Sequence, residues 1–548
     1  MRSKAARRQH WAPTDFRIGE EPGSALNDID WLVDNCEAYE SLVRAVRDAR
    51  ESIWISQLAF DADCKAYPLD DGRIEAEADG ESVLDAILAT SEEHRVSVRI
   101  LLNSTLLLNT KRPLVRFLTG CKRDAGLVEV RGVSRFPQLL HAKMVVIDGR
   151  RAFLMGSPFV NGYWDAPSHQ PVDHRRPRRE LGGRPVHDVS VALRGEAVHD
   201  LAGVFARLWK CAGPADVNDA SNAEVTRVGQ EEVTRAVHEE ATPEPPVRAR
   251  AIHRPAAERG IEVVTTEPDG VRGSINPGSR RTLDALLEGI GRARSLIYIE
   301  HQYLSSRPVV EALRTALNRS PALELVLVLN QNPDVTAYRR WQNARLSESG
   351  LLAHPRVGVF ALWSAAVKNG ARPSINQVFV HSKVVIADDE WAMVGSANLD
   401  GASLDSYGDD FSSLLGRRVF RDVRNFDVSV VFTSGKSAGV QNPIRGLRER
   451  LWIEHLGRGS LPAMKLQSRP VAEWKALAAQ NVAALNAREP SAQGVLNGTF
   501  ILPYSTSPRP RGQLADVGVR RGSSLDLQFD PGWLEVNFSP NWVRNMFL

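Results

Sequence analysis

Short apolar runs rich in β-branched residues alternate with amphipathic segments along most of the chain. Apolar runs of this length are typical of buried strands, and the amphipathic segments are typical of helices packed on a sheet. In the first part of the chain the pattern predicts two helices, at 38–50 and 197–209, and five strands, at 52–58, 96–102, 128–130, 141–148 and 188–193. Strands that alternate with helices favour an α/β fold whose sheet is covered on both faces.

The second part of the chain repeats this order. A helical pattern at 283–294 leads into a strand at 295–303, and further strands are expected at 323–329, 381–388 and 427–432. The offsets agree, because Gln302 − Gln57 is 245, His381 − His141 is 240 and Asp427 − Asp188 is 239. A repeat of this length is too long for a solenoid and predicts two duplicated α/β-sandwich domains. If they pack about a pseudo-twofold axis, His141 and His381 come together.

The pattern divides the chain into five segments. The linker is charged, poor in apolar residues and contains a Pro-rich stretch, and the C-terminal segment is expected to form a small β-rich extension. The segments are an N-terminal arm (1–30), a first half (31–211), a linker (212–260), a second half (261–457) and the extension (458–548).

Each half contains one copy of the pattern His-x-Lys-x4-Asp. The first copy holds His141, Lys143 and Asp148, and the second holds His381, Lys383 and Asp388. Side chains two apart on a strand point to the same face, so each base is expected beside its cation. A base next to a cation on a rigid strand can bind a phosphate and attack it.

This duplicated motif is the signature of the phospholipase D superfamily, and the chain resembles its eukaryotic-type members over about 35–460. Three further segments resemble that group, namely Ile297–Leu304, Gly162–Asp165 with His169, and Arg450–Gly457. The resemblance implies the phospholipase D fold and cleavage of a phosphodiester through a phosphohistidine. By analogy His141 is the nucleophile and His381 the general acid and base, although the sequence itself does not separate these two roles.

The resemblance also implies roles for other polar residues. Lys143 and Lys383 would neutralise the phosphate, and Ser396 and Asn398 match phosphate-contacting positions. Asp188 and Asp427, 47 and 46 residues after the histidine of their own half, match the acids that orient the imidazoles, so each is expected to orient the histidine of its own half. Gln57 and Gln302 are further candidates for binding the phosphate, on neighbouring strands.

Asp148 and Asp388 are expected to serve the fold instead. They lie seven residues from their histidine, which is more than ~20 Å along a straight strand. The first half also departs from the second, because Ser157 is displaced by one position and Pro158 stands where the second half has Asn398. This departure puts a symmetric phosphate-binding site in doubt. The Arg-rich segment 175–185 is open to two interpretations, a solvated loop or a phosphate-facing rim.

Composition narrows the choice of function. The 548 residues carry a net charge of only +3, which does not favour a protein that coats nucleic acid. Four cysteines without a Cys-x-x-Cys pair favour neither a disulfide scaffold nor a zinc site. No carboxylate cluster indicates a metal, so no metal or other cofactor is expected in the chemistry. The basic N-terminus is not followed by an apolar run, and no stretch approaches the ~20 apolar residues of a membrane span.

The sequence therefore predicts a cytoplasmic monomer that acts on phospholipids at a membrane surface, as a phospholipase D-type hydrolase or transphosphatidylase. A cardiolipin synthase-like transferase uses the same chemistry. A nuclease or other phosphodiesterase is the alternative within the superfamily, and only this alternative involves nucleic acid. A catalytically inactive binding scaffold is disfavoured because both His/Lys pairs are intact.

Overall fold

A computed structural model describes two long ranges of the chain. The first is 28–212 except 71–72, 75–78, 106–107, 121–126, 135–137, 178–180 and 182, and the second is 260–506 except 270–277, 335, 367–373, 407–421, 435–441, 457–468 and 487–497. The predicted linker lies outside the described residues, apart from its end positions 212 and 260.

The first half is built on a seven-stranded sheet with the strand order β1-β13-β11-β10-β2-β7-β8. Helices α1 and α2 cover one face, where Leu42 and Ile87 pack with Ile53, and α4 covers the other, where Phe205 packs with Trp54. A fourth helix, α3, lies beside β7 and β8. The bounds are β1 Asp28–Val33, α1 Asp34–Arg47, β2 Ser52–Ser56, α2 Val83–His94, β7 Ser97–Asn103, α3 Lys111–Gly120, β8 Val128–Val133, β10 Met144–Ile147, β11 Arg151–Leu154, β13 Val189–Arg194 and α4 Glu196–Cys211.

The second half is built on a larger sheet whose main order is β15-β14-β23-β22-β21-β16-β17-β18-β19. Helices α7 and α8 pack on one face, and α11 and α12 pack on the other. The bounds are β14 Ile261–Glu267, β15 Ser279–Arg280, α7 Arg281–Arg292, β16 Leu296–His301, α8 Arg307–Arg319, β17 Glu324–Leu329, α9 Thr336–Glu348, β18 Val357–Ala366, β19 Ser374–Gln377, β21 Lys383–Ala387, β22 Trp391–Gly395, β23 Asn425–Thr433, α11 Pro443–Leu456 and α12 Pro470–Asn486.

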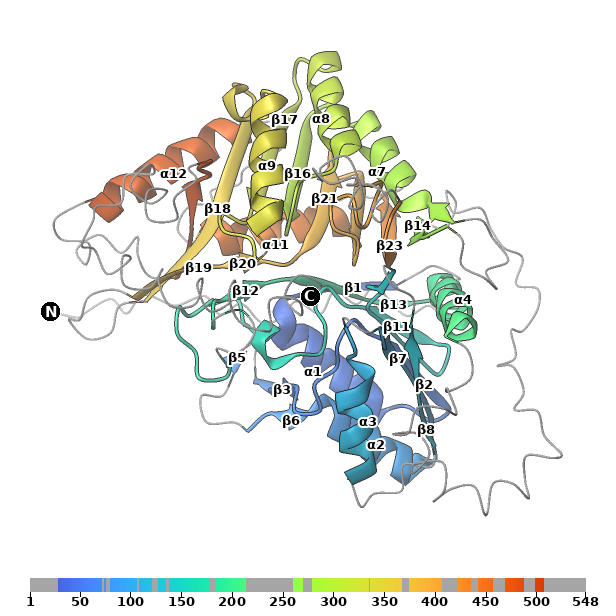
Figure 1. The fold of residues 1–548 in the computed structure, drawn as a ribbon. Helices are drawn as coiled ribbons and strands as arrows, with labels where there is room; N and C mark the ends of the chain where they lie inside the picture. The colour runs from blue at the N-terminus through green and yellow to red at the C-terminus, as the bar shows by residue number, and fades with distance from the viewer. Residues whose placement is uncertain are drawn as a thin grey trace, which may run out of the picture.

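The two sheets have the same plan. Reading across each sheet, β1, β13, β11, β10, β2, β7 and β8 correspond to β14, β23, β22, β21, β16, β17 and β18. Parallel pairs join β2 to β7 and β16 to β17, and antiparallel pairs join β10 to β2 and β21 to β16. The predicted fold class, two duplicated α/β domains, is therefore confirmed. Figure 1 shows the first half in blue and green below the second half in yellow and red.

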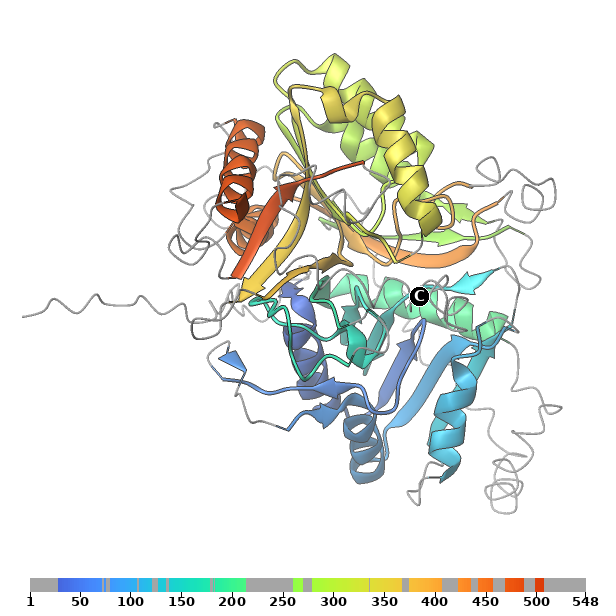
Figure 2. The ribbon, with the colours of Figure 1, turned by 60° about the vertical axis from the view of Figure 1, so that its left-hand side comes forward.

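Two short parallel pairs cross from one half to the other. Strand β9 (Leu139–Leu140), just before His141, pairs with the start of β23, and β12 (Val186–His187) pairs with β20 (Phe379–Val380), just before His381. The two crossings correspond by the offsets of the repeat. Apolar residues of both halves, Trp54 and Phe205 of the first and Tyr298 and Trp474 of the second among them, belong to one shared core. Figure 2 shows the two halves meeting along this interface.

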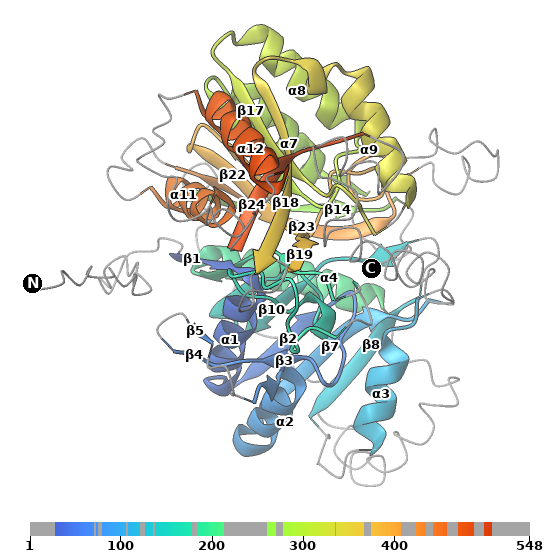
Figure 3. The same ribbon diagram turned by 90° about the vertical axis from the view of Figure 1, so that its left-hand side faces the viewer.

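Some expected boundaries are wrong. The arm does not extend to residue 30, because β1 begins at Asp28. Residues 470–486 and 498–503 do not form part of a separate extension, because β24 (Gly498–Pro503) pairs with β18 and α12 packs Trp474 against Phe360 and Trp452. Figure 3 shows α12 and β24 against the second sheet. The end of the predicted extension, residues 507–548, lies outside the described residues.

Short elements connect these layers. Two small antiparallel strand pairs follow β2 in the chain. One 3-10 turn is described in the first half and one in the second half. Their bounds are β3 Lys65–Ala66, β4 Leu69–Asp70, β5 Arg73–Ile74, β6 Glu81–Ser82, η1 Asn161–Tyr163 and η2 Leu351–Ala353.

Candidate active site

The two His/Lys pairs lie at the interface between the halves, and their residues are buried. The strand expected at 141–148 begins only at Met144, so His141 and Lys143 lie in the segment between β9 and β10. His381 likewise precedes β21, of which Lys383 is the first residue. In both motifs the lysine side chain nonetheless contacts the histidine two residues before it. Lys143 Nζ lies 3.1 Å from His141 Nε2, and Lys383 Nζ donates to the backbone oxygen of His381.

Each imidazole is held by an aspartate of the other half. His141 Nδ1 lies 2.6 Å from Asp427 Oδ1, and His381 Nδ1 lies 2.8 Å from Asp188 Oδ2. The expected pairing within each half is therefore wrong. The cross-half strand pairs explain the exchange, since His141 N donates to Phe426 O and His381 N donates to His187 O, one residue before each aspartate.

Serine hydroxyls hold both aspartates from their own half. Ser396 Oγ donates to Asp427 Oδ1 at 2.7 Å, and Ser157 Oγ donates to Asp188 Oδ2. Asn35 Nδ2 donates to Ser157 Oγ at 2.9 Å. The one-residue displacement of Ser157 in the sequence therefore leaves this contact symmetric. Ser396, expected to contact phosphate, has its hydroxyl directed to the orienting carboxylate.

Gly156 lies directly against the Asp188 carboxylate, and Gly395 lies directly against Ser429, two residues after Asp427. A Cβ on Gly156 would lie 2.0 Å from Asp188 Oδ1, and a Cβ on Gly395 would lie 2.1 Å from Ser429 Oγ. Such distances are far shorter than any van der Waals contact, so a larger residue would displace the groups behind the imidazoles.

Asp148 and Asp388 lie at the turns that follow β10 and β21. The Asp148 carboxylate accepts from the backbone N–H groups of Arg50, Glu51 and Ser52. The Asp388 carboxylate accepts from those of Arg294, Ser295 and Leu296. Each therefore fixes the chain that enters the neighbouring strand, and its contacts are those of a residue that supports the fold.

The two imidazoles are kept neutral. Burial, together with Lys143, lowers the pKa of His141 to about 4, and burial, together with Lys383, lowers the pKa of His381 to about 3. Burial raises the pKa of the Asp188 carboxyl, but His381 and Lys383 outweigh it and bring the value to about 2. A neutral imidazole that donates Nδ1–H to a carboxylate presents the lone pair of Nε2, which is what a nucleophile or base requires.

The two lysines form a buried cationic pair. Burial lowers the pKa of Lys383 to about 8, and burial together with Lys383 lowers the pKa of Lys143 well below its ordinary value. Two ammonium groups close together in a buried site repel each other, and an anion bound beside them would relieve this repulsion. The arrangement is thus suited to neutralising the non-bridging oxygens of a phosphodiester.

The register of the sheets changes one expected correspondence. Ser56 lies opposite Met144 and Glu300 lies opposite Val384, so the counterpart of Gln57 is His301 and not Gln302. In the described part of the chain, neither polar atom of the buried Gln57 side chain has a hydrogen-bond partner, and neither does His301 Nδ1. His301 was not among the candidates expected from the sequence, although it lies within the segment Ile297–Leu304 and directly precedes Gln302.

Four other polar residues complete the surroundings. Gln302 Nε2 donates to Tyr303 Oη at 2.9 Å, while Gln302 Oε1 and Asn398 Oδ1 are buried without a partner among the described residues. Asn103 and Asn330 each form two hydrogen bonds with the backbone of the residue before a motif histidine, Leu140 and Val380. An asparagine at the end of an apolar strand, present once in each half, was the available sequence signal for these two braces.

In the Arg-rich segment, the arginines that the structure describes each contact other parts of the protein. Arg175 pairs with Asp173 and lies over the Trp164 ring, and the buried Arg176 pairs with Asp165. Arg184 donates to Asn332 O and lies over the Phe379 ring. The described arginines of this segment therefore contribute mainly to packing at the interface.

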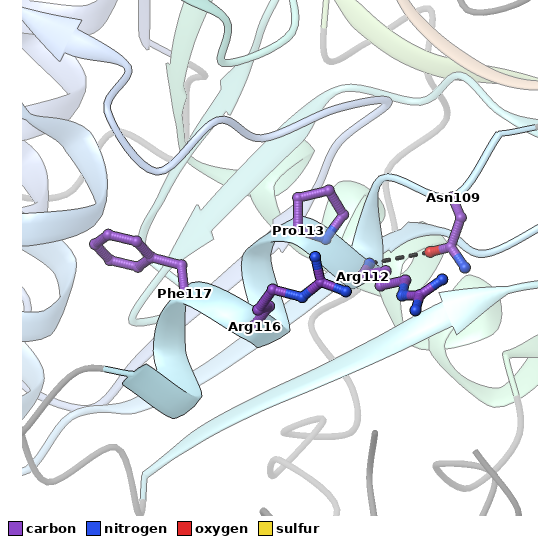
Figure 4. A pocket seen from close by; sticks show the side chains of 5 residues that line it. All are labelled: Asn109, Arg112, Pro113, Arg116 and Phe117. Carbon is purple, nitrogen blue, oxygen red and sulfur yellow. Dashed lines mark hydrogen bonds between the residues drawn. The ribbon is translucent and has the colours of Figure 1, made fainter. Parts of the chain in front are cut away.

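A separate surface pocket lies on α3. It is lined by Asn109, Arg112, Pro113, Arg116 and Phe117, and Figure 4 shows both arginine side chains on the same stretch of this helix. The Phe117 side chain is 42% exposed. None of the helices in the described ranges combines the length and the apolar character that a membrane crossing needs.

The chain is similar to several known proteins. The family described as "Cardiolipin synthase, PLD-like domain" matches residues 286–425. Phospholipase D alpha 2 of Oryza sativa subsp. japonica is 30% identical over 442 residues, 61% of this chain and 51% of that protein. The cardiolipin synthase of Clostridium perfringens is 20% identical over 414 residues, 73% of this chain and 71% of its own length. Phosphatidylserine synthase of Haemophilus influenzae Rd KW20 aligns in structure with a TM-score of 0.47 and 14% identity, covering 78% of this chain and 85% of that one.

Residues 286–425 match a phospholipase D-like domain, and the chain is similar to members of the phospholipase D superfamily. Within it, the chain is similar both to plant phospholipase D and to bacterial cardiolipin synthase, and it spans about half the length of the plant relative.

Proposed function

We propose that the protein is a phospholipase D-type phosphodiesterase that cleaves the distal phosphodiester of a glycerophospholipid and transfers the phosphatidyl group to water or an alcohol. The observation that carries this proposal is the pair of buried His–Asp contacts formed across the interface, with a lysine beside each imidazole. One site then holds two bases and two cations, the set that a double displacement at phosphorus needs.

In the proposed reaction the Nε2 of His141 forms a bond to phosphorus while the bond from phosphorus to the headgroup oxygen breaks. The leaving oxygen takes a proton from His381. The negative phosphate beside His381 raises the pKa of this imidazole, so that it can carry that proton. Water or an alcohol then gives a proton to His381 and attacks phosphorus, which breaks the P–N bond. The products are the free headgroup and phosphatidic acid or a phosphatidylalcohol.

Other groups have supporting roles in this proposal. Asp427 and Asp188 hold the imidazole tautomers, Lys143 and Lys383 neutralise the phosphate, and Gln57 Nε2 and His301 Nδ1 offer buried donor atoms for its oxygens. A general acid or base of this kind is typically worth about 10²–10⁴-fold in rate.

We also propose that α3 contacts the lipid surface. Phe117 is exposed beside Arg112 and Arg116, and neither guanidinium has an ion-pair partner in the described part of the chain. An aromatic side chain with flanking cations suits the interface of a bilayer that contains anionic lipids.

The test is incubation with phosphatidylcholine vesicles and a short primary alcohol, with lipid products separated by chromatography. Phosphatidylalcohol and choline are expected from the wild type and not from His141→Ala. A second arm supplies phosphatidylglycerol alone, where cardiolipin as the product would assign the related transferase reaction. Cleavage of single-stranded DNA without any lipid product would replace the proposal with a nuclease. Activity that survives His141→Ala would overturn the catalytic assignment.

A further inference from the structure

A second group of buried ionisable side chains lies behind the catalytic residues and takes no part in the proposed chemistry. It contains Asp34 at the start of α1, His169 in the loop after η1, His187 in β12 and Glu454 in α11. One ligand-type atom from each of the four lies within 4.8 Å of all the others. The first three come from the first half and Glu454 from the second, so the group joins the two halves.

The distances between these atoms are those of hydrogen bonds and ion pairs, and most are a few tenths of an ångström shorter than the distances between the ligands of a metal ion. His187 Nδ1 lies 3.0 Å from Asp34 Oδ1 and 2.8 Å from Glu454 Oε1, and His169 Nε2 lies 3.0 Å from Glu454 Oε1 and 3.6 Å from Asp34 Oδ2. Ligand atoms about 2.0–2.2 Å from a tetrahedral Zn²⁺ are about 3.4 Å from each other. Shifts of a few tenths of an ångström would accommodate the ion.

The ring nitrogen that faces away from the centre is occupied in both histidines. His169 Nδ1 lies 2.9 Å from Asp165 Oδ2, and His187 Nε2 lies 3.1 Å from Glu300 Oε1. Metal-binding histidines almost always donate their other N–H to a carboxylate or carbonyl in this way, which fixes the tautomer and makes the ligand nitrogen more basic. Glu300 is itself held by Tyr298 Oη and His455 Nε2, each at 2.8 Å.

Two further observations point to a ligand. Asp34 Oδ2 is buried without a hydrogen-bond partner among the described residues, and the Asp34 residue is 1% exposed. Asp34 and His169 also have positive φ angles, 64° and 40°, which L side chains rarely adopt. Such strained positions collect where the surrounding structure requires a side chain to reach one place.

We propose that Asp34, His169, His187 and Glu454 bind one divalent transition-metal ion of the zinc type, as a structural site that joins the two halves. Binding balances in charge and atoms, because the dication replaces two protons, those on His169 Nε2 and His187 Nδ1, which leave to solvent. Four protein ligands close the coordination shell, so the ion holds structure and offers no open position for chemistry.

The position of the site links it to catalysis. Asp34 N donates to Asp188 O at 2.8 Å, and His187 O accepts from His381 N at 2.8 Å. Asp34 and His187 thus hold the backbone on both sides of the Asp188–His381 contact. An ion that fixes these two side chains would keep the orienting carboxylate of one half against the imidazole of the other.

The sequence did not favour a zinc site, because it has no Cys-x-x-Cys pair. Residues 34, 169, 187 and 454 have no local spacing pattern. His169 and Glu454 do belong to two segments that resemble eukaryotic-type phospholipase D, and the catalytic chemistry leaves both residues without a role.

The test is the metal content of the full-length protein, measured by mass spectrometry after incubation with Zn²⁺ and gel filtration. The wild type is expected to retain one zinc ion per chain and to melt at a higher temperature than protein dialysed at length against a chelator. Co²⁺ in place of Zn²⁺ is expected to give the visible absorption of a tetrahedral site.

Matched variants locate the ion. His169→Gln and Glu454→Gln are expected to lose the ion, whereas His199→Gln, at an exposed position of α4, and His141→Asn, in the active site, are expected to retain it. A wild type that retains no zinc and gives no tetrahedral cobalt spectrum would overturn the proposal even if the cluster variants fail to fold. Equal loss of metal from His141→Asn and His169→Gln would also overturn it. None of these readouts depends on lipid turnover, so they remain valid if the proposed function is wrong.

Discussion

The two His–Asp contacts are alike in themselves and are supported in different ways. The residue before Asp188 is His187, which contacts Asp34, Glu300 and Glu454, whereas the residue before Asp427 is Phe426, which belongs to the shared apolar core. On the neighbouring strand, Glu300 of the second half occupies the place of Ser56 in the first. The buried ionic group therefore lies on one side of the pseudo-twofold axis only.

This difference shows which part of a duplicated site has to remain symmetric. In the proposed reaction the distance and direction of each imidazole toward phosphorus are fixed, and the histidine, lysine, aspartate and serine occur in both halves. The groups behind them have only to hold the carboxylate in place. An apolar core does this for Asp427, and a network of charges does it for Asp188.

The largest expected effect separates the two histidines. With the phosphohistidine on His141, His381→Asn should accumulate a labelled covalent intermediate from a phosphorus-labelled lipid, and His141→Asn should form none. Both variants should lose at least about 10³-fold in turnover, because a nucleophile or a general acid is missing. Gel analysis of the denatured protein measures the label. A labelled His141→Asn with an unlabelled His381→Asn would reverse the two roles.

The cross-half pairing makes the next prediction. Asp427→Asn should shift the imidazole nitrogen resonances of His141, and Asp188→Asn should shift those of His381, because each carboxylate accepts from that ring. Turnover should fall by about 10²-fold or more in both, since the ring loses the charge that stabilises its protonated form. Nitrogen NMR of histidine-labelled protein is the measurement. Shifts in the histidine of the same half would contradict the structure.

The glycines test how closely each carboxylate is packed. Gly156→Ala should cost about 1–3 kcal/mol of unfolding free energy and most of the activity, because its Cβ would lie 2.0 Å from Asp188 Oδ1. Gly395→Ala, whose Cβ would meet Ser429 Oγ, should cost similar stability and less activity. Denaturant unfolding and turnover measure the two quantities. Equal losses of activity in the two variants would contradict the distinction.

The pH dependence should differ between lysine variants. Burial lowers the pKa of Lys383 to about 8, so the ammonium is charged below this pH and loses its proton above it. Turnover of the wild type should therefore fall about tenfold per pH unit above about 8. Lys383→Arg keeps its charge, so its remaining activity should not fall over the same range. An unchanged alkaline limb in that variant would assign the titration to another group.

The smallest expected effect concerns the lipid surface. Phe117→Ser should weaken binding to vesicles that contain anionic lipid by about 3–10-fold, because one exposed aromatic side chain no longer inserts. Turnover of a short-chain lipid below its critical micelle concentration should be unchanged. Vesicle sedimentation measures the binding. Equal loss of activity on both substrates would place Phe117 outside a role in membrane contact.

Much of the site was open to prediction from local patterns. The apolar runs and the repeat of about 240 residues gave the duplicated fold, and the motifs gave both histidines and lysines. The role of Asp188 and Asp427 followed from the resemblance to the phospholipase D superfamily. The pairing between these residues did not, because a repeat states which positions are equivalent and does not state which copy lies against which.

By itself, therefore, the sequence determined the kinds of residues at the site and their place on each sheet, since strand periodicity and turn contacts act over a few residues. Only the tertiary structure decided that Asp427 serves His141, that His301 and not Gln302 corresponds to Gln57, and that Asp34, His169, His187 and Glu454 meet. These contacts join positions up to several hundred residues apart. They form because two short strand pairs cross the interface between the halves, and the local sequence does not encode that packing.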